Sequence, residues 1–202
     1  MYQIKGSDVL KEFDVVKAKA SIGEDIEVCA CVHKVRQMSG FAFVILRTGR
    51  YIVQTIYSPD DCSDSLDGIK EGCYVKTIGN VRIEKKAPNG IELHLKKINL
   101  LSKPDYDYPL QVSHKKLGCS LDINLDLRSV ALRNPYEKAA FKLQEGIVGG
   151  FREFMLDNNF TEIHTPKIVA QGAEGGANIF RLDYFDKEAF LNQSPQFYKQ
   201  SA

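Results

Sequence analysis

The chain has 202 residues, of which 44% are hydrophobic and 26% are charged, and its formal net charge is +1 at pH 7. This composition is typical of a soluble globular protein with one large or two small domains. The near-neutral charge argues against a generally basic coat, so any contact with RNA has to be local. The sequence has no run of 18 apolar residues, so it predicts no membrane-spanning helix. The N-terminus does not have the pattern of a signal peptide.

The five cysteines are scattered along the chain and form no CxxC pair. Structural zinc sites usually contain such pairs, so the sequence predicts no metal site in this chain. Unpaired, scattered cysteines are typical of proteins in a reducing compartment, and we expect a cytoplasmic location.

After about 20 polar and mixed residues, with room for one short helix, five segments have the pattern of β-strands. In the first, Ile26, Val28, Ala30 and Val32 alternate with polar or cysteine residues, which indicates a half-buried strand. The other four are predicted at residues 41–47, 51–56, 73–81 and 91–100. The acidic segment 60–72 predicts a short helix that ends near Gly72. Three strands, a helical connection and two more strands fit the five-stranded OB barrel.

The second half of the chain begins with a linker and a long helix. Two prolines in residues 103–109 predict the linker, and residues 110–133 have no clear periodicity. Asn134 can cap a helix that starts at Pro135, and Glu137 completes the spacing of a capping box. Apolar residues then recur every three or four positions up to Phe154. Gly149 and Gly150 lie inside this helix and lower its stability. They either allow the backbone of a partner to approach closely or only mark a less stable part of the helix.

The C-terminal segment predicts a β-hairpin with polar groups on both sides of it. Apolar runs at 179–185 and 189–191 flank a turn at Asp186 and Lys187. Glu174 precedes the hairpin, while Gln196 and Lys199 follow it. A carboxylate, an amide and an ammonium near one sheet could bind an amino acid that carries a second carboxylate. The alternative is a surface loop, a hairpin and a solvated lysine.

The motifs EGGAN, F-x-x-x-YF and QSPQ-x-YKQ resemble the aspartate-binding wall of class II aspartyl-tRNA synthetases of the archaeal and eukaryotic type. The resemblance implies that the loop with Glu174 closes over the amino acid. It also implies that Gln196 contacts the ammonium group and that Lys199 pairs with the side-chain carboxylate. Ala173 departs from the family, which usually has Ser or Thr there.

Two further segments resemble the same family. The long helix followed by residues 160–169, an extended segment with Pro166, is similar to motif 1, which implies a homodimer with Pro166 at its interface. On physical grounds alone, Pro166 only marks an edge strand.

The run from Val32 to Ile56 is similar to the anticodon-binding strands of these synthetases. The resemblance implies that Phe43 stacks on the middle anticodon base, that Gln54 reads this base, and that Glu92 helps to read a neighbour. Arg36 is suited to bind a phosphate or to stack. The alternative is that the strand aromatics, with Phe41 and Tyr51 among them, are core or surface residues. The turn at 86–90 resembles that of members that also charge asparagine tRNA.

The resemblance predicts an α+β chain with an OB-fold anticodon-binding domain at 1–102, a hinge at 103–133, and the start of a class II catalytic domain at 134–202. It implies an aspartate–tRNA ligase whose partners are aspartate, tRNA(Asp) and, as a second candidate, tRNA(Asn). ATP and magnesium are expected for the full-length enzyme, whose arginines of motifs 2 and 3 are not in this sequence, so no catalytic residue is predicted here. The alternatives are an asparaginyl-tRNA synthetase and a non-catalytic RNA-binding protein.

Overall fold

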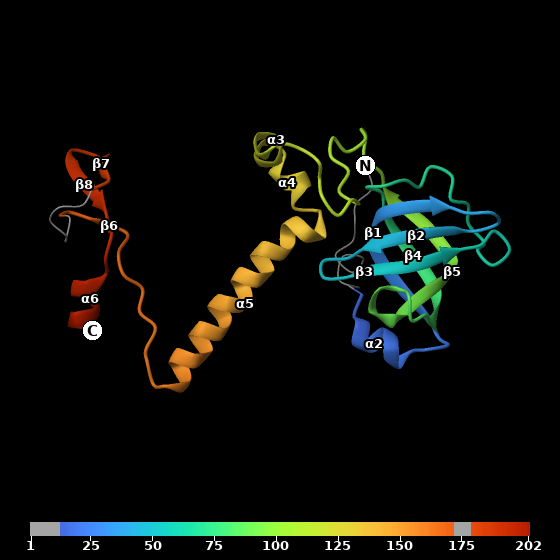
Figure 1. The fold of residues 1–202 in the computed structure, drawn as a ribbon, viewed down its shortest axis with the longest axis horizontal. Coiled ribbons are helices and arrows are strands. Elements are labelled where there is room, and N and C mark those ends of the chain that lie inside the picture. The colour runs from blue at the N-terminus through green and yellow to red at the C-terminus, as the bar shows by residue number, and fades with distance from the viewer. Residues whose placement is uncertain (1–12, 172–178) are drawn as a thin grey trace. The chain divides into compact units, whose positions relative to one another are not determined.

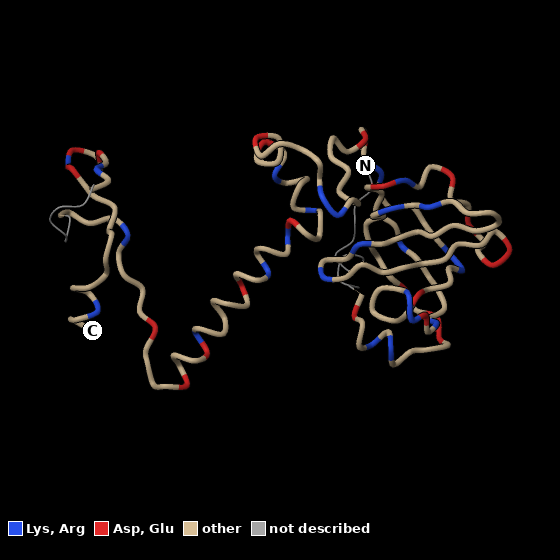
Figure 2. Tube along the Cα trace, viewed as in Figure 1, with Lys and Arg blue, Asp and Glu red and all other residues tan. Residues whose placement is uncertain are grey.

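A computed structural model divides the chain into two compact units, Met1–Ala140 and Phe141–Ala202. The structure describes residues 13–171 and 179–202. Along the trace, both units carry lysine and arginine as well as aspartate and glutamate (Figure 2).

The first unit contains a closed five-stranded barrel (Figure 1). Neighbouring strands follow the order β1-β2-β3-β5-β4, and all pairs are antiparallel except the parallel pair β3–β5. This topology confirms the five predicted strands and the OB fold. The strands are β1 (Asp25–Gln37), β2 (Ala42–Arg47), β3 (Ile52–Tyr57), β4 (Tyr74–Ile83) and β5 (Ile91–Ser102).

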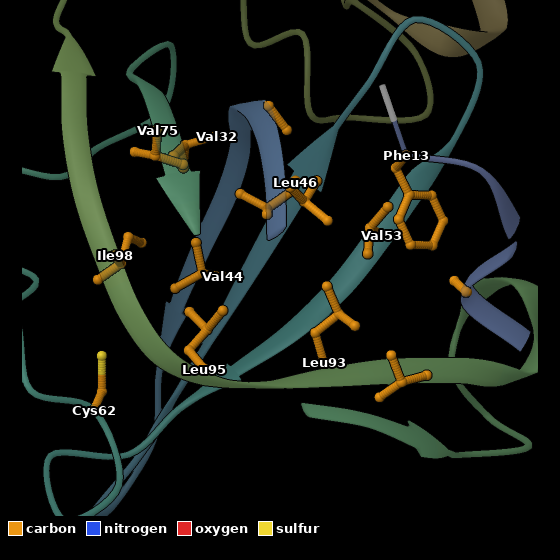
Figure 3. Packing of buried hydrophobic residues seen from close by; sticks show 14 of the residues in the cluster. Phe13, Val32, Val44, Leu46, Val53, Cys62, Val75, Leu93, Leu95 and Ile98 are labelled. Atoms are coloured by element: carbon orange, nitrogen blue, oxygen red, sulfur yellow. The ribbon is translucent and has the colours of Figure 1, made fainter. Parts of the chain in front are cut away.

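The core of the barrel follows from the alternation of the strands. Side chains on every second position point inward, so Val44 and Leu46 of β2 meet Leu93 and Leu95 of β5 in one apolar cluster (Figure 3). Helix α2 (Val15–Ala20) adds Ala18 to this cluster, and Phe13 just before the helix also lies in it. Asp14 caps α2, because its carboxylate accepts hydrogen bonds from two backbone amides of the first turn.

The prediction of a short helix at 60–72 is wrong, since the structure has turns there instead. Polar side chains bind backbone groups and hold the segment against β5: Asp64 Oδ2 accepts from Ile98 N at 2.8 Å. Cys62 is buried in the barrel core. Gly72 has a φ of +90°, and a Cβ there would lie 2.9 Å from the ring of Tyr108, so this position requires glycine.

Residues 103–140 pack into the first unit and contain structure that the sequence did not predict. Two short helices, α3 (Leu121–Asp126) and α4 (Arg128–Ala131), lie in the segment that we expected to be irregular. Leu110, Val112 and Ala131 form a second small core. The role of residues 103–133 as a hinge stays a prediction.

Helix α5 (Pro135–Asp157) starts where the sequence predicts. Asn134 is fully buried, and its Oδ1 accepts from Tyr136 N at 2.8 Å and from Glu137 N at 3.2 Å, so the predicted cap is confirmed. The predicted capping box is wrong. Asn134 N donates to Ala131 O instead, and Glu137 Oε2 accepts from Asn124 Nδ2 at 3.2 Å.

The second unit contains the rest of α5 and a small three-stranded sheet with the order β6-β8-β7. Strands β7 (Arg181–Tyr184) and β8 (Lys187–Leu191) form the predicted hairpin, with β6 (Ile168–Val169) beside β8. The turn is Phe185 and Asp186, one residue earlier than predicted, and Phe185 has the positive φ of 54° that such a turn needs. Only residues 168 and 169 of the predicted extended segment 160–169 form a strand. Helix α6 (Gln196–Ser201) ends the unit.

Candidate nucleic-acid interface

The outer face of the barrel brings four predicted site residues together. Val44 and Leu46 point into the core, so Phe43 and the other odd-numbered residues of β2 point outward. On each neighbouring strand, the residues that pair with these outward residues also point outward. The paired positions are Arg36 with Phe43, Ile45 with Gln54, and Gln54 with Glu92. Strands β1, β2, β3 and β5 therefore form one surface that presents Arg36, Phe43, Gln54 and Glu92.

The half-buried ring of Phe43 lies among groups that favour stacking. Arg36 Cζ lies 5.5 Å from the centroid of the ring, within the range of a cation–π contact. Phe41 meets the same ring edge to face, with 5.3 Å between the centroids. Tyr51, which we also considered as a stacking residue, packs instead against the barrel core and the ring of Phe13.

Next to Phe43, a buried carboxylate holds two side chains in place. Gln54 Nε2 donates to Glu92 Oε2 at 2.9 Å, and His94 Nε2 lies 2.9 Å from Glu92 Oε1. The side chain of Glu92 is almost fully buried. Both carboxylate oxygens are thus engaged, which is how a buried carboxylate is normally satisfied. Sequence reasoning missed His94, although it shares the outward face of β5 with Glu92, two residues away.

This network determines which groups of Gln54 face the surroundings. One N–H of its amide points to Glu92, which leaves the carbonyl oxygen and the second N–H for a ligand. A reversed amide would bring its oxygen against a carboxylate oxygen and would be unfavourable. The face therefore presents one acceptor and one donor side by side, next to an aromatic ring.

The turn between β4 and β5 is fixed against the same region. It contains the short 3₁₀ helix η1 (Pro88–Gly90), in which Asn89 has a φ of 65°. Asn89 Nδ2 donates to Ile52 O of β3 at 3.0 Å. The turn is thus tied to the strand that carries Gln54.

The predicted amino-acid site is described only in part. Gln196 and Lys199 are three residues apart on α6, so they share one side of this helix. Both are exposed, and Lys199 lines a hollow of about 750 Å³ together with apolar residues of α5 such as Phe151 and Met155. Glu174 and Ala173 lie outside the described residues.

The predicted interface residue Pro166 is exposed just before β6. Its carbonyl oxygen accepts from Asn192 Nδ2 at 3.1 Å, which ties it to the end of β8. Its place in a dimer stays a prediction.

No helix within residues 13–171 and 179–202 has the length and apolar character needed to cross a membrane. In the same part of the chain, no three or more histidine, cysteine, aspartate or glutamate side chains are grouped to hold a metal ion.

The closed barrel and the segment that follows it match two known protein families. Residues 26–101 match the family described as "OB-fold nucleic acid binding domain", and residues 120–202 match "tRNA synthetases class II (D, K and N)". These matches place residues 120–202 in the class II tRNA synthetase family and residues 26–101 in the OB-fold nucleic-acid-binding family.

Among curated relatives, the aspartate–tRNA(Asp/Asn) ligase of Archaeoglobus fulgidus is 38% identical over 182 residues, which are 88% of this chain and 42% of that protein. The ligase of the same name from Methanocorpusculum labreanum is 40% identical over 177 residues, or 86% of this chain and 41% of that protein. The chain thus spans less than half the length of these relatives.

Solved structures show the same fold. The asparaginyl-tRNA synthetase from Pyrococcus horikoshii complexed with asparaginyl-adenylate aligns with a TM-score of 0.77 and 26% identity, over 90% of this chain and 42% of that one. A putative aspartyl-tRNA synthetase from Leishmania major aligns with a TM-score of 0.71 and 27% identity, over 92% of this chain and 39% of that one.

Proposed function

We propose that the whole protein is an aspartate–tRNA ligase and that the outer face of the barrel binds the anticodon of its tRNA. The observation that carries the proposal is the oriented amide of Gln54, which Glu92 holds on the same outer face as the ring of Phe43. The curated relatives, which are named aspartate–tRNA(Asp/Asn) ligases, support this choice of tRNA.

The exposed groups of Gln54 match uracil. The codons of aspartate and asparagine have adenine at the second position, so the middle anticodon base of their tRNAs is uracil. Uracil presents an N3–H donor beside a carbonyl acceptor, and the Gln54 amide presents an acceptor beside a donor. Phe43 offers a surface on which the same base can stack, which contributes about 1–3 kcal/mol per base.

Lys199 favours aspartate as the amino acid. Its ammonium can form a charge-assisted hydrogen bond with the side-chain carboxylate of aspartate, whereas asparagine has an amide there. Gln196, on the same side of α6, is assigned to the ammonium group of the substrate, and Glu174 to the loop that closes over it. Activity in the cytoplasm as a homodimer with Pro166 at the interface is part of the same proposal.

ATP and magnesium belong to the proposal for the whole protein only. ATP would supply the adenylate group that activates aspartate, with magnesium bound at its phosphates. The described residues 13–171 and 179–202 contain no acidic cluster suited to hold this ion. The roles proposed for the described residues are tRNA binding and amino-acid binding.

A second candidate is asparagine–tRNA ligation. The observation that favours it is the similarity of the fold to the Pyrococcus asparaginyl-tRNA synthetase, at 26% identity. The middle base does not distinguish the two candidates, because it is uracil in both tRNAs. The choice rests on the amino-acid site, where Lys199 favours aspartate.

The experiment compares binding of an aspartate tRNA transcript by the parent chain and by Phe43→Ala at fixed salt. Loss of stacking should weaken binding by about 5- to 140-fold. Phe180→Ala, which removes an exposed ring in the second unit, is the matched control and should bind like the parent. If Phe43→Ala also binds like the parent, the barrel face is not the anticodon site.

A further inference from the structure

The outer face of the barrel continues from Phe43 to a hollow beside Arg47. Arg47 ends β2 and points outward like Phe43, because Val44 and Leu46 between them point into the core. The hollow has a volume of about 340 Å³, and its lining includes Cys31, Arg47, Thr48, Gly49 and Lys138. All of these residues belong to the first unit.

One N–H group of the Arg47 guanidinium donates no hydrogen bond to any described residue. Its Nε is buried and has no hydrogen-bond partner in the part of the chain that the structure describes. Buried donors are nearly always paired, and an unpaired one on a charged group is costly. An arginine is a donor only, so the group that would satisfy Nε has to be an acceptor.

Lys138 brings a second positive charge to the hollow. Its Nζ donates to Gly49 O at 3.0 Å, which holds the side chain over the β2–β3 turn. An ammonium has three donors, and this bond uses one of them. The lining residues in the described part of the chain include these two cations and no aspartate or glutamate.

A neighbouring histidine experiences the positive charge of this region. His33 is buried on β1, and its Nδ1 has no hydrogen-bond partner within the described residues. Burial, followed by the charges of Arg47 and Lys34, lowers the pKa of His33 to about 4. Burial is the largest cause and opposes a charge of either sign, whereas the smaller contributions of Arg47 and Lys34 reflect the positive charge of this region.

We propose that Arg47 and Lys138 bind one backbone phosphate of the RNA strand whose base stacks on Phe43, an inference that rests on the proposed function. Phe43 and Arg47 are four residues apart on one strand face, or about 13–14 Å at the usual rise per residue. An OB fold binds about 4–16 nucleotides, so a strand anchored at Phe43 extends past that position. Arginine suits this role because its fork of donors matches the oxygens of a phosphate.

The test measures binding of an aspartate tRNA transcript as a function of salt for the full chain and three variants. Each phosphate that is neutralised contributes about 0.7 to the slope of log K against log salt for a single strand. Arg47→Gln and Lys138→Gln should therefore each reduce this slope by up to about 0.7. Raising the salt from 50 to 200 mM weakens binding by a certain factor in the parent. In a variant that lacks the contact, this factor should be about 2.6 times smaller. Lys19→Gln, which removes an exposed charge on α2, is the matched control and should keep the parent slope.

The outcomes separate this inference from the proposed function. If Phe43→Ala weakens binding but both Gln variants keep the parent slope, the phosphate site is wrong and the anticodon assignment stands. If the parent chain does not bind the tRNA, both proposals are wrong. A titration with inorganic phosphate alone tests whether the hollow binds a small anion instead. If phosphate binding saturates and Arg47→Gln abolishes it, while the salt slope of tRNA binding is unchanged in that variant, the assignment to RNA is wrong.

Discussion

Gln54 Nε2 on β3 donates a hydrogen bond to Glu92 Oε2 on β5, with 2.9 Å between the two atoms. The two residues are 38 positions apart and are paired in the only parallel register among the described barrel strands. This strand pair closes the barrel. The orientation of the Gln54 amide, and with it the pattern of donor and acceptor offered to a base, is therefore a consequence of barrel closure.

Glu92→Gln should relax the choice of base at the middle anticodon position. A glutamine at 92 can donate or accept, so the Gln54 amide is no longer held in one orientation. A well-placed pair of hydrogen bonds contributes about 1–3 kcal/mol of discrimination between bases. The preference of the parent for uracil over cytosine, about 5- to 140-fold on that scale, should fall toward one in the variant.

The measurement for Glu92→Gln compares binding of two tRNA transcripts that differ only in this base. Glu24→Gln, a change at an exposed glutamate before β1, is the control for the loss of a negative charge. An undiminished preference in Glu92→Gln would show that Glu92 does not orient Gln54.

The sequence predicted the barrel because its strands have a clear period of two and are separated by turn residues. Alternation also placed Phe43 on one face of its strand with Phe41 and Ile45, whereas its link to Gln54 came from the resemblance to the anticodon-binding strands. The contact between Glu92 and His94 was missed, because alternation places them on one face but does not show that their side chains bond.

Other features could not be predicted because they depend on contacts distant in sequence or on very short elements. Lys138 reaches Gly49 across 89 positions, and no local pattern indicates this pairing. Helices α3 and α4 have six and four residues, too few for a periodic pattern to be visible. The capping box failed because Asn134 N already has a partner in Ala131 O, a carbonyl of α4.

Asn134→Ala should destabilise the first unit. Asn134 caps α5 through Oδ1, and its Nδ2 donates to Val112 O at 3.0 Å and to His114 O at 2.6 Å. Loss of the cap and of donors to buried carbonyls should lower the free energy of unfolding by about 2–4 kcal/mol. Urea unfolding monitored by circular dichroism measures the change. Asn99→Ala, at an exposed position of β5, is the control and should change the value by less than about 0.5 kcal/mol.

His33 should make the stability of the first unit depend on pH. Its folded pKa of about 4 lies below the ordinary value of 6.5, so the unfolded chain binds more protons between these values. The stabilising effect of the neutral histidine is complete above pH 6.5 and is lost as the pH falls toward 4. At about 1.4 kcal/mol per pKa unit, the full effect is up to about 3 kcal/mol.

The test of His33 compares urea unfolding of the parent and of His33→Gln at several pH values from 4 to 7.5. The variant should show a flatter dependence on pH in this window, whatever its absolute stability. Parallel curves for the two proteins would contradict the role of His33. His164→Gln, at an exposed position of the second unit, is the control and should leave the pH dependence of the first unit unchanged.

Lys199→Leu in the whole protein should erode the preference for aspartate over asparagine. The ammonium would bind the side-chain carboxylate of aspartate, and hydrogen bonds to charged groups contribute about 1.5–3 kcal/mol. We therefore expect the parent to prefer aspartate by roughly tenfold or more, and the variant to lose most of this preference. Lys199 is exposed on α6 and lines a hollow that also has apolar residues of α5 such as Phe151 and Met155 in its wall, so a leucine can be accommodated there. Activation of the two amino acids, measured side by side, tests the preference, with Lys187→Leu at an exposed position of β8 as the matched control. If Lys199→Leu keeps the ratio of the parent, the lysine is an ordinary surface residue and the main physical reason to choose aspartate is lost.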